Sequence, residues 1–592
     1  MNEKYNWKLT DLFKTKQDFD SEKLKLQENM NKIQKYKDIL CESSDNLYNV
    51  YVLYEQILLS FEKIYSYGMF NYHLDMTNQE AIKLFKEVEN ISAELGVATS
   101  FIVPEITFAD EEKIREYLKN DIRLQPYTCD IESILEEKKH VLSNEKEELL
   151  ANYLEVFSAP ENIYDILTNA EFNLGILKDE EGNEVVLTDA NYTKYLKSRN
   201  VEVRKQAFKL MYNKYKEYIN TITEIYLANV KQTVITAKIR KYASSLEQAT
   251  TKDDSTIKVY EALMKGIENS LQVNHDFMEL KKKILKLDTM HMYDIYVNPF
   301  VEKEENITFE QAKNEVKHSL SILGEEYIKL LDEAFENNWI DVEEKPHKRG
   351  GAYSSGVYGV HPFILTNFNG NKRDVSTIAH ELGHSIHSYY SNKNQNILNA
   401  NYTIMVAEVA STVNEILLSE YQIANEKNTY KKAEYIYELL EMIRATFYRQ
   451  AMFAEFEKNI HEKIEKKENL SSENLNNIYY KLNEKYFGKS IYIDNEIQYE
   501  WARIPHFYTD FYVYKYATGI SAAVCIATKI LNKEEGFIQK YINMLSKGRT
   551  KKSIELLKMV DVDLESEKTY IEVAKYFSKK MEELKQICKE GV

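Results

Sequence analysis

The sequence predicts a large, mainly α-helical protein with a small β-sheet, because helix breakers are scarce and apolar residues recur at helical spacing. Among 592 residues there are only 17 glycines and 7 prolines, the residue types that most often end helices. Apolar residues make up 44% of the chain and charged residues 29%, which is ordinary for a folded globular protein and excludes a disordered one. We therefore expect many helices that each bury one face.

Along the chain, helical segments dominate and two short β regions interrupt them. Residues 1–110 show helical periodicity broken by short polar joints, which predicts an N-terminal helical lobe. Residues 111–200 read as a second helical unit that ends in a hairpin, since two apolar runs flank the turn sequence Asp-Glu-Glu-Gly-Asn. Helices resume in residues 201–592, with two short strands expected within 355–374. The charged stretch 455–477 is expected to be a solvated connection.

Composition excludes several classes of partner. A formal net charge of −17 argues against nucleic acid, since phosphate binding requires concentrated lysine and arginine. We expect a cytoplasmic protein without a membrane partner, because no signal-peptide pattern opens the chain and no run approaches the roughly 18 to 20 apolar residues of a membrane span. The oligomeric state stays open. Four widely spaced cysteines are expected to be free thiols: Cys41, Cys129, Cys525 and Cys588.

The most informative motif is H-E-x-x-H at residues 380–384, inside a stretch that reads as one amphipathic helix. Histidines four residues apart lie on one helical face, so His380 and His384 can bind the same metal ion. Glu381 can then contact a water molecule on that ion without being a ligand. The motif predicts one zinc ion per chain, with Asp374 as a candidate N-cap of the helix. An apolar stripe should hold the helix against the core: Val375, Ile378, Ala379, Leu382 and Ile386.

A second predicted helix supplies the third protein ligand that zinc hydrolases need. Glu408 lies among apolar neighbours in the sequence V-A-E-V-A, which is an unusual setting for a solvated carboxylate. We predict it as a ligand; the alternative is a surface glutamate. His387, seven residues after His380, cannot easily join both other histidines on one small ion, so a place beside the ligands or toward the substrate is expected. Glu415 is either a hydrogen-bond partner of a ligand histidine or a surface carboxylate.

The sequence resembles peptidase family M3, the thimet oligopeptidase group, and within it the bacterial oligoendopeptidase F branch. The resemblance rests on HELGHSIHSYYS and VAEVASTVNE, and it extends to KRGGAYSSGVYGVHPFILTNFNG, RIPHFYTDFYVYKYATGISAA and the opening YNWKLTDLF. It covers essentially the whole chain. It implies a two-lobed helical zinc peptidase with a deep central channel that excludes folded proteins. It also implies an oligopeptidase F-type N-terminal domain over 111–200 and the zinc peptidase catalytic domain over 201–592.

The same resemblance implies that a histidine and tyrosines near the C-terminus bind the substrate carbonyl and the oxyanion. By position relative to the family pattern, Tyr514 is favoured as the oxyanion donor, with His506 and Tyr508 beside it. Tyr512 and Tyr516 are equally consistent with an aromatic packing face. The loop after His506 is shorter than in the thimet branch, so the tyrosines do not align one to one with it.

Upstream of the predicted zinc helix, a glycine pair suggests a loop near the substrate. Gly350 and Gly351 precede Tyr353, and the strand that follows could pair with an extended peptide, the usual way in which peptidases bind backbone.

Together these features predict a cytosolic zinc oligoendopeptidase that cleaves internal bonds of short, unstructured peptides. In the predicted mechanism, zinc-bound water is the nucleophile and Glu381 is the general base. One alternative is a catalytically silent peptide-binding protein, which has no need of Glu381. The other is a zinc hydrolase of non-peptide amides, against which the tyrosine-rich segment and the whole-chain resemblance argue.

Overall fold

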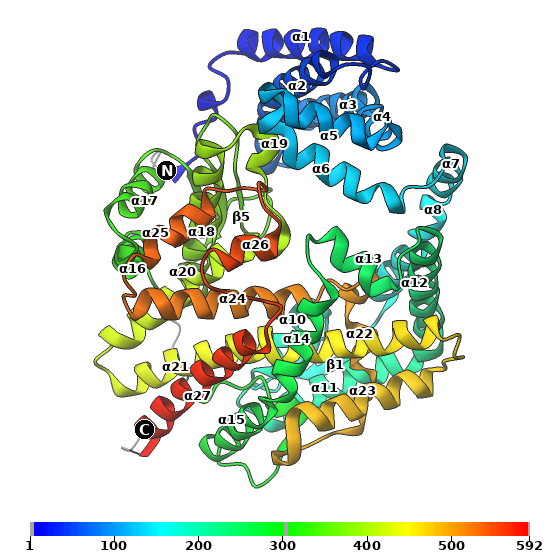
Figure 1. Ribbon diagram of the computed structural model, residues 1–592. Coiled ribbons are helices and arrows are strands. Elements are labelled where there is room, and N and C mark those ends of the chain that lie inside the picture. Colours follow the sequence, from blue (N-terminus) through cyan, green and yellow to red (C-terminus); the bar gives the residue numbers. More distant parts are fainter. Residues whose placement is uncertain (1–4, 301–305, 590–592) are drawn as a thin grey trace. The chain divides into compact units, whose positions relative to one another are not determined.

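The structure, a computed structural model, describes residues 5–300 and 306–589 and is mainly helical, as the sequence predicts (Figure 1). Helices account for 73% of it, and the described strands form three small sheets. Contacts divide the chain into two compact units. Unit 1 contains Met1–Val141, Glu304–Tyr421 and Ile526–Asp561. Unit 2 contains Leu142–Lys303, Gln422–Cys525 and Val562–Val592. The expected three-part division by residue number stays a prediction.

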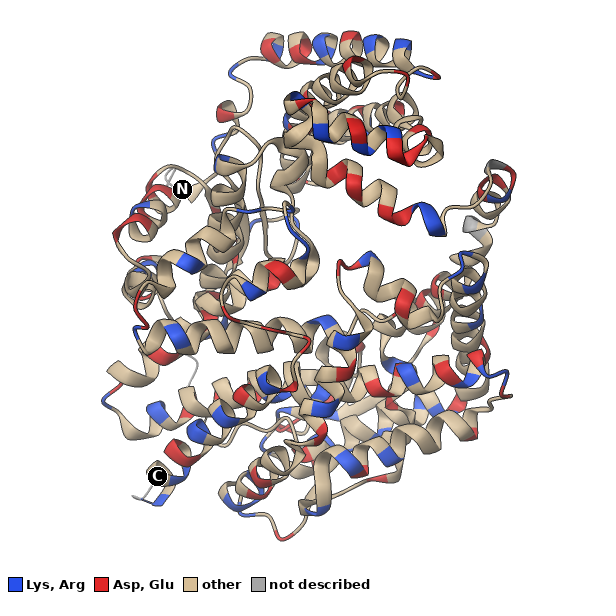
Figure 2. Cartoon of the chain, in the orientation of Figure 1, with Lys and Arg blue, Asp and Glu red and all other residues tan. Residues whose placement is uncertain are grey.

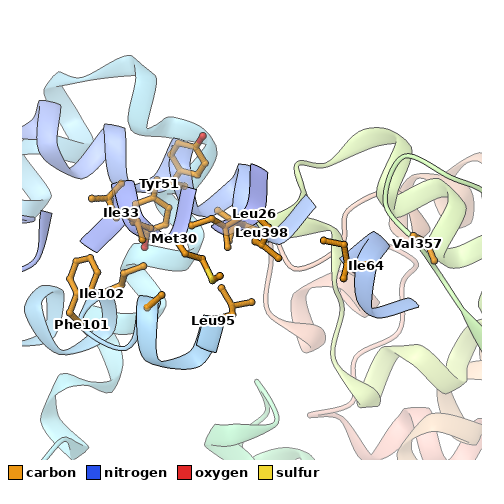
Figure 3. Packing of buried hydrophobic residues seen from close by; sticks show 14 of the residues in the cluster. Leu26, Met30, Ile33, Tyr51, Ile64, Leu95, Phe101, Ile102, Val357 and Leu398 are labelled. Atoms are coloured by element: carbon orange, nitrogen blue, oxygen red, sulfur yellow. The ribbon is translucent and has the colours of Figure 1, made fainter. Parts of the chain in front are cut away.

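The N-terminal part of unit 1 is a group of helices around one hydrophobic core. Its first three long helices begin at residues whose side chains accept a backbone N–H of the first turn, namely Thr15, Ser43 and Asn78. Figure 3 shows side chains from several helices meeting in this core, joined by Leu398 and Val357 from later parts of unit 1. The helices are α1 (Lys16–Ile33), α2 (Ser44–Leu74), α3 (Gln79–Thr99), α4 (Ile102–Phe108), α5 (Glu111–Asn120) and α6 (Thr128–Glu137).

One stretch of this group, Gln79–Phe108, is long and apolar enough by length and composition to cross a membrane. It is not an uninterrupted apolar run, since it contains charged residues such as Lys83, Glu87 and Glu94. A single stretch of this kind is weak evidence for a span: Val88, Leu95 and Ile102 in it belong to the core just described, although only 28% of its most apolar window is buried.

The rest of unit 1 carries a three-stranded sheet with strand order β4-β6-β5. β4 (Ile340–Glu343) runs parallel to β6 (Phe363–Phe368), and β5 (Tyr353–Ser355) pairs with the other side of β6 in antiparallel register. The two strands expected within 355–374 are thus present, shifted slightly toward the N-terminus. Helix α18 (Lys372–Asn394) contacts the sheet, and four helices contact α18: α16 (Phe309–Leu320), α17 (Glu325–Glu336), α19 (Ile397–Ala400) and α25 (Phe537–Leu545). Helix α26 (Ser553–Lys558) also belongs to this unit.

Helix α18 contains the H-E-x-x-H motif and packs on this sheet. The expected apolar stripe is buried, with every member at most 1% exposed. The expected N-cap, Asp374, is wrong by three positions: Asn371 is the N-cap, and its side chain accepts the Asp374 backbone N–H. Asp374 instead completes a capping box by accepting the N–H of Asn371.

Helix α20 (Ile404–Asn425) lies against α18 at very short range. A methyl group on Gly383 of α18 would lie 2.6 Å from the Cα of Ser411 in α20, so only glycine allows this approach. Next to it, the Asn414 amide donates a hydrogen bond of 3.0 Å to the carbonyl of Ala379. The Tyr327 hydroxyl of α17 donates to Asn414 in turn. These contacts fix α20 relative to the motif.

Unit 2 begins with short helices and the hairpin expected from the sequence. β1 (Ile176–Lys178) and β2 (Glu184–Val186) pair antiparallel, with Ile176 opposite Val186. Longer helices follow, together with a two-residue pairing of β3 (Met290–His291) and β7 (Ile491–Tyr492). The helices before β3 are α7 (Asn144–Asn152), α8 (Leu154–Phe157), α9 (Ala159–Asp165), α10 (Asp189–Leu196), α11 (Val201–Glu217), α12 (Ile219–Ile239), α13 (Ser245–Lys252), α14 (Ile257–Glu268) and α15 (Leu271–Ile284).

The expectation that residues 455–477 form a solvated connection is wrong for most of that stretch. Helix α22 (Arg449–Glu465) runs through its first half, and Phe456, Ile460 and His461 are buried there. Only residues 466–471 separate α22 from α23 (Ser472–Phe487). The other late helices are α21 (Thr429–Ile443), α24 (Tyr514–Leu531) and α27 (Glu567–Lys589).

Charged residues of both signs are interspersed along helices of both units, for example on α1 and α27 (Figure 2). Some charges are buried in pairs, such as Arg204 with Asp294 at 2.7 Å in unit 2, which satisfies groups that would otherwise be costly to bury. The four cysteines are free, as expected.

Candidate active site

Three side chains of unit 1 converge as the sequence predicts for metal ligands. His380 and His384 come from α18 and Glu408 comes from the first turns of α20. The two Nε2 atoms are 3.1 Å apart, and Glu408 Oε2 lies 3.4 Å from His380 Nε2 and 3.5 Å from His384 Nε2. Among the described residues, this is the one group of three or more potential ligands that lies close enough to share an ion.

The spacing of these atoms fits zinc. Four-coordinate zinc with bonds of about 2.0–2.1 Å places its tetrahedral ligands about 3.3–3.4 Å apart, close to the separations here. The charge also fits a cation. Burial opposes protonation of His380, but hydrogen bonds with Glu408 and Glu415 outweigh it and raise the pKa of His380 to about 10. Burial acts to raise the pKa of Glu408, yet its hydrogen bonds with the two histidines hold that pKa well below its usual range.

Glu415 lies behind the first of these histidines. Its Oε1 is 2.9 Å from His380 Nδ1, so a neutral His380 with its hydrogen on Nδ1 donates to Glu415 and directs the Nε2 lone pair toward Glu408 and His384. This is the usual arrangement of a metal-binding histidine and a supporting carboxylate. Of the two alternatives expected for Glu415, a hydrogen-bond partner of a ligand histidine or a surface carboxylate, the first matches the 2.9 Å contact with His380.

Glu381 follows His380 and is 7% exposed. Burial raises its pKa above the ordinary glutamate value, although the neighbouring histidines act in the opposite direction. A glutamate with a raised pKa is better able to retain and release a proton near neutral pH than an exposed one.

His387 lies on the same helix but is only 1% exposed. Its ring stacks on Tyr402 with centroids 3.6 Å apart and an interplanar angle of 6°. Burial lowers the pKa of His387 to about 3, so the ring is neutral. The Tyr402 hydroxyl is 2.8 Å from Ser388 Oγ. His387 therefore packs beneath the motif and belongs to its support.

The glycine pair upstream is tied to β6. Asn367 donates hydrogen bonds of 2.9 and 2.8 Å to the carbonyls of Arg349 and Gly351. Gly350 and Gly351 are exposed, and Gly351 has φ +80°, which favours glycine. The loop is thus anchored at its base by side-chain contacts.

Tyr353, at the start of the edge strand β5, is held by α2. Its hydroxyl is 2.7 Å from His73 Nδ1, and the Arg349 guanidinium is 2.8 Å from His73 Nε2. Burial, with Arg349 close by, lowers the pKa of His73 to about 4, so His73 accepts from Arg349 and donates to Tyr353. No sequence signal connects these three residues, since His73 is far from the other two along the chain.

In unit 2, His506 and the tyrosines of residues 503–523 form two sets, one partly or fully exposed and one buried. His506 is exposed, and Tyr512 and Tyr516 are half-buried beside it. The rings of His506 and Tyr512 lie 5.9 Å apart and those of Tyr512 and Tyr516 lie 5.4 Å apart. The Tyr516 hydroxyl is 3.4 Å from His506 Nε2. These three residues are the solvent-facing cluster.

Tyr508 and Tyr514 point into unit 2. Tyr508 is 8% exposed and stacks on Tyr164 with centroids 4.5 Å apart. Tyr514 is fully buried, and its hydroxyl donates a 3.2 Å hydrogen bond to Asp253. Burial, and then the charge of Asp253, raise the pKa of Tyr514 well above its ordinary value. Of the four tyrosines in this segment, Tyr512 and Tyr516 are therefore the partly exposed ones.

Comparisons with known proteins agree with the whole-chain resemblance. The model of peptidase family M3 matches residues 194–576, and the model named oligopeptidase F matches residues 105–173. Oligopeptidase PepF of Bacillus subtilis (strain 168) is 38% identical over 581 residues, covering 98% of this chain and 87% of that protein. The oligoendopeptidase F homolog of Borreliella burgdorferi is 36% identical over 592 residues, with 99% of each chain covered.

Solved structures match along the same length. A Chlamydophila abortus protein crystallised as a candidate peptidase has TM-score 0.92 and 31% identity, with 99% of each chain covered. Oligoendopeptidase-F from Enterococcus faecium has TM-score 0.73 and 30% identity, covering 97% of this chain and 99% of that one.

Proposed function

We propose that this chain, which belongs to peptidase family M3 and is a metallo-endopeptidase, uses one zinc ion to hydrolyse internal bonds of short, unstructured peptides. The observation that carries the proposal is the convergence of His380, His384 and Glu408 at separations that suit zinc, with the buried Glu381 next to them. The names of relatives along the whole chain support peptides as the substrate class.

The proposed roles of the unit 1 residues follow from their contacts. His380, His384 and Glu408 hold the ion, and Glu415 fixes the orientation of His380 through its Nδ1. A zinc ion held there would supply Lewis-acid activation of a water molecule and of the scissile carbonyl. Glu381 accepts the proton of that water and delivers it to the leaving amine, which its raised pKa favours.

The oxyanion that forms during peptide hydrolysis requires hydrogen-bond donors. We propose that the His506 segment supplies them. The family pattern favours Tyr514, with His506 and Tyr508 beside it, whereas solvent exposure favours Tyr512 and Tyr516 together with His506. Conservative Tyr-to-Phe substitutions can separate these assignments, because each removes one hydroxyl and keeps the ring.

The edge strand β5 is the proposed place where the substrate backbone pairs. It hydrogen-bonds to β6 on one side only within the three-stranded sheet, and it begins at Tyr353, directly after Gly350 and Gly351. An extended peptide can add to such an edge without its side chains being read. The deep channel, which the family resemblance implies, and a cytoplasmic location are part of the same proposal.

Digestion of a synthetic peptide library, followed by mass spectrometry, tests the proposed function. The purified protein should cut internal bonds of short peptides, lose this activity on treatment with a chelator, and regain it on addition of zinc. Glu381→Gln is the matched control, since it changes one oxygen to an NH₂ group beside the metal ligands. Cleavage of non-peptide amides but not of peptides would favour a different zinc hydrolase. Peptide binding without cleavage by the zinc-loaded protein would favour a binding protein.

A further inference from the structure

A tight turn divides the segment that carries the solvent-facing cluster. The Tyr512 N–H donates a 3.1 Å hydrogen bond to the carbonyl of Thr509, which closes a four-residue turn with Asp510 and Phe511 at its centre. Phe511 has φ +49°, in the left-handed region that such turns normally fill with glycine or asparagine. A bulky residue is strained there, and it stays only where surrounding contacts hold it.

The contact that holds Phe511 comes from α22. The backbone N–H of Phe511 donates a 2.6 Å hydrogen bond to Oε1 of Glu457 in α22. Glu457 is 0% exposed. The Phe511 ring packs 4.5 Å from the ring of His461 and 6.2 Å from that of Tyr260, measured between centroids. The second oxygen of Glu457 has no hydrogen-bond partner among the described residues, so the carboxyl group is held in this network through its contact with the Phe511 N–H.

The other central residue of the turn is held by α12. Asp510 accepts a hydrogen bond from the Thr233 hydroxyl, and its Oδ1 lies 3.4 Å from the amide nitrogen of Asn229. The same amide lies 3.5 Å from the carbonyl of Tyr508. The turn is thus fastened between two helices of unit 2, α12 and α22 (Figure 1).

The hydrogen bond between Glu457 and the Phe511 N–H does not require a charge on Glu457. Burial raises the pKa of Glu457 well above its ordinary value, the Phe511 amide acts in the opposite direction, and nearby Asp510 raises it further. Burial also raises the pKa of Asp510 to about 6 and lowers that of His461 to about 3. A neutral side chain at 457 whose carbonyl oxygen accepts the same N–H should therefore substitute for the glutamate.

We propose that Glu457 is a positioning residue for the peptidase reaction: by accepting the Phe511 N–H it keeps Phe511 in the left-handed region within the Thr509–Tyr512 turn, and so sets His506 and Tyr512 side by side. His506 lies before the turn and the two tyrosines of the cluster lie after it. Rotation of Phe511 out of the left-handed region would change the chain direction at Tyr512 and separate the cluster. This inference rests on the proposed function, because the cluster is assigned there to substrate and oxyanion binding.

Three variants test the role. Glu457→Met keeps the length of the side chain and removes the acceptor, whereas Glu457→Gln keeps an acceptor oxygen. Thr233→Val loosens the same turn from the α12 side with little change in shape. The control is Phe277→Leu, a core change in unit 2 whose ring contacts Tyr437 and Phe577 and should lower the melting temperature without touching the turn.

We expect kcat of Glu457→Met to fall about 10- to 100-fold with KM changed by less than about threefold, as for a small misplacement of catalytic donors. The kcat of Thr233→Val should also fall, but by less, and Glu457→Gln should retain most of the activity. Zinc content should equal that of the wild type in all variants. Phe277→Leu should keep kcat, which separates positioning from a general loss of stability.

Amide hydrogen exchange provides a readout that does not depend on peptidase activity. Peptides spanning residues 506–516 should exchange faster in Glu457→Met than in the wild type or in Glu457→Gln, and Thr233→Val should show the same change. Unchanged exchange and kcat in both Glu457→Met and Thr233→Val would overturn the proposal, as would an equal loss of kcat in Glu457→Gln and Glu457→Met. A wild-type protein without peptidase activity would refute the proposed function instead, and the exchange data would still decide whether Glu457 holds the turn.

Discussion

Replacement of Gly383 by alanine tests whether the spacing of α18 and α20 determines metal binding. The added Cβ would lie 2.6 Å from Ser411 Cα and 2.8 Å from the carbonyl oxygen of Ala410. Ordinary contacts begin at 3.4 Å, so α20 must retreat by about 0.8 Å at this point. The contacting atoms are backbone atoms of a helix, which cannot rotate away as a flexible side chain can.

The retreat matters because α20 carries Glu408 one turn before Ser411. Metal sites tolerate deviations of only about 0.2 Å in ligand distance, so the ligand set must readjust or bind zinc more weakly. Overpacking costs about 1–3 kcal/mol, while alanine in place of glycine in a helix returns up to about 1 kcal/mol. We expect zinc affinity to fall about 10- to 100-fold, the range typical of changes behind a metal ligand, with a modest loss of stability.

The assay is competition for zinc with a chelator of known affinity, alongside thermal unfolding followed by circular dichroism. Gly96→Ala in α3 is the matched control, since its added Cβ would meet nothing within 4 Å. That variant should bind zinc like the wild type and be unchanged or slightly more stable. A Gly383→Ala protein with wild-type zinc affinity and activity would refute the argument that this backbone contact sets the ligand geometry.

Four further predictions concern the proposed chemistry. Glu408→Ala should lose zinc and activity together, since it removes one of three protein ligands; a purified variant with one zinc per chain would exclude Glu408 as a ligand. Glu381→Gln should retain zinc by metal analysis yet lose turnover, and near wild-type hydrolysis would exclude Glu381 as the base. Phe in place of the tyrosine that stabilises the oxyanion should lower kcat roughly 10²-fold with little change in KM; comparing Tyr514→Phe with Tyr516→Phe shows whether the family pattern or the exposure identifies it. A bond cut in a free peptide should be spared when it is buried in a stable protein, since exposing it costs up to about 5–15 kcal/mol; equal cleavage of both by mass spectrometry would indicate a general endoprotease.

The convergence of His380, His384 and Glu408 in one candidate metal site was predictable from sequence because its determinants are local. Spacing of four residues places His380 and His384 on one face wherever that helix forms, and apolar neighbours mark Glu408 as facing inward. For Glu415 the sequence allows two alternatives, a hydrogen-bond partner of a ligand histidine or a surface carboxylate, because the choice depends on how two helices pack. That packing depends on Gly383, whose importance appears only when α20 is in place.

Other errors have a similar cause. Residues 455–477 look solvated by average composition, yet Phe456 and Ile460 are four residues apart and bury one face of α22. Glu457 lies in the core although glutamate is usually exposed, because burial raises its pKa and so favours the neutral form, and a backbone N–H from residue 511 donates to it. A partner 54 residues away leaves no mark on the local pattern.

The C-terminal tyrosines show how secondary structure decides which side chains can serve the reaction. Tyrosine at residues 508, 512, 514 and 516 suggests alternation, and in a strand the last three would share one face. Instead, Tyr512 ends the turn at Phe511 and helix α24 begins at Tyr514. The rings of Tyr512 and Tyr516 lie 5.4 Å apart, while Tyr514 is buried and bonds to Asp253. Which of these tyrosines is buried therefore depends on where the turn ends and the helix begins, and the spacing of the tyrosines in the sequence does not encode either point.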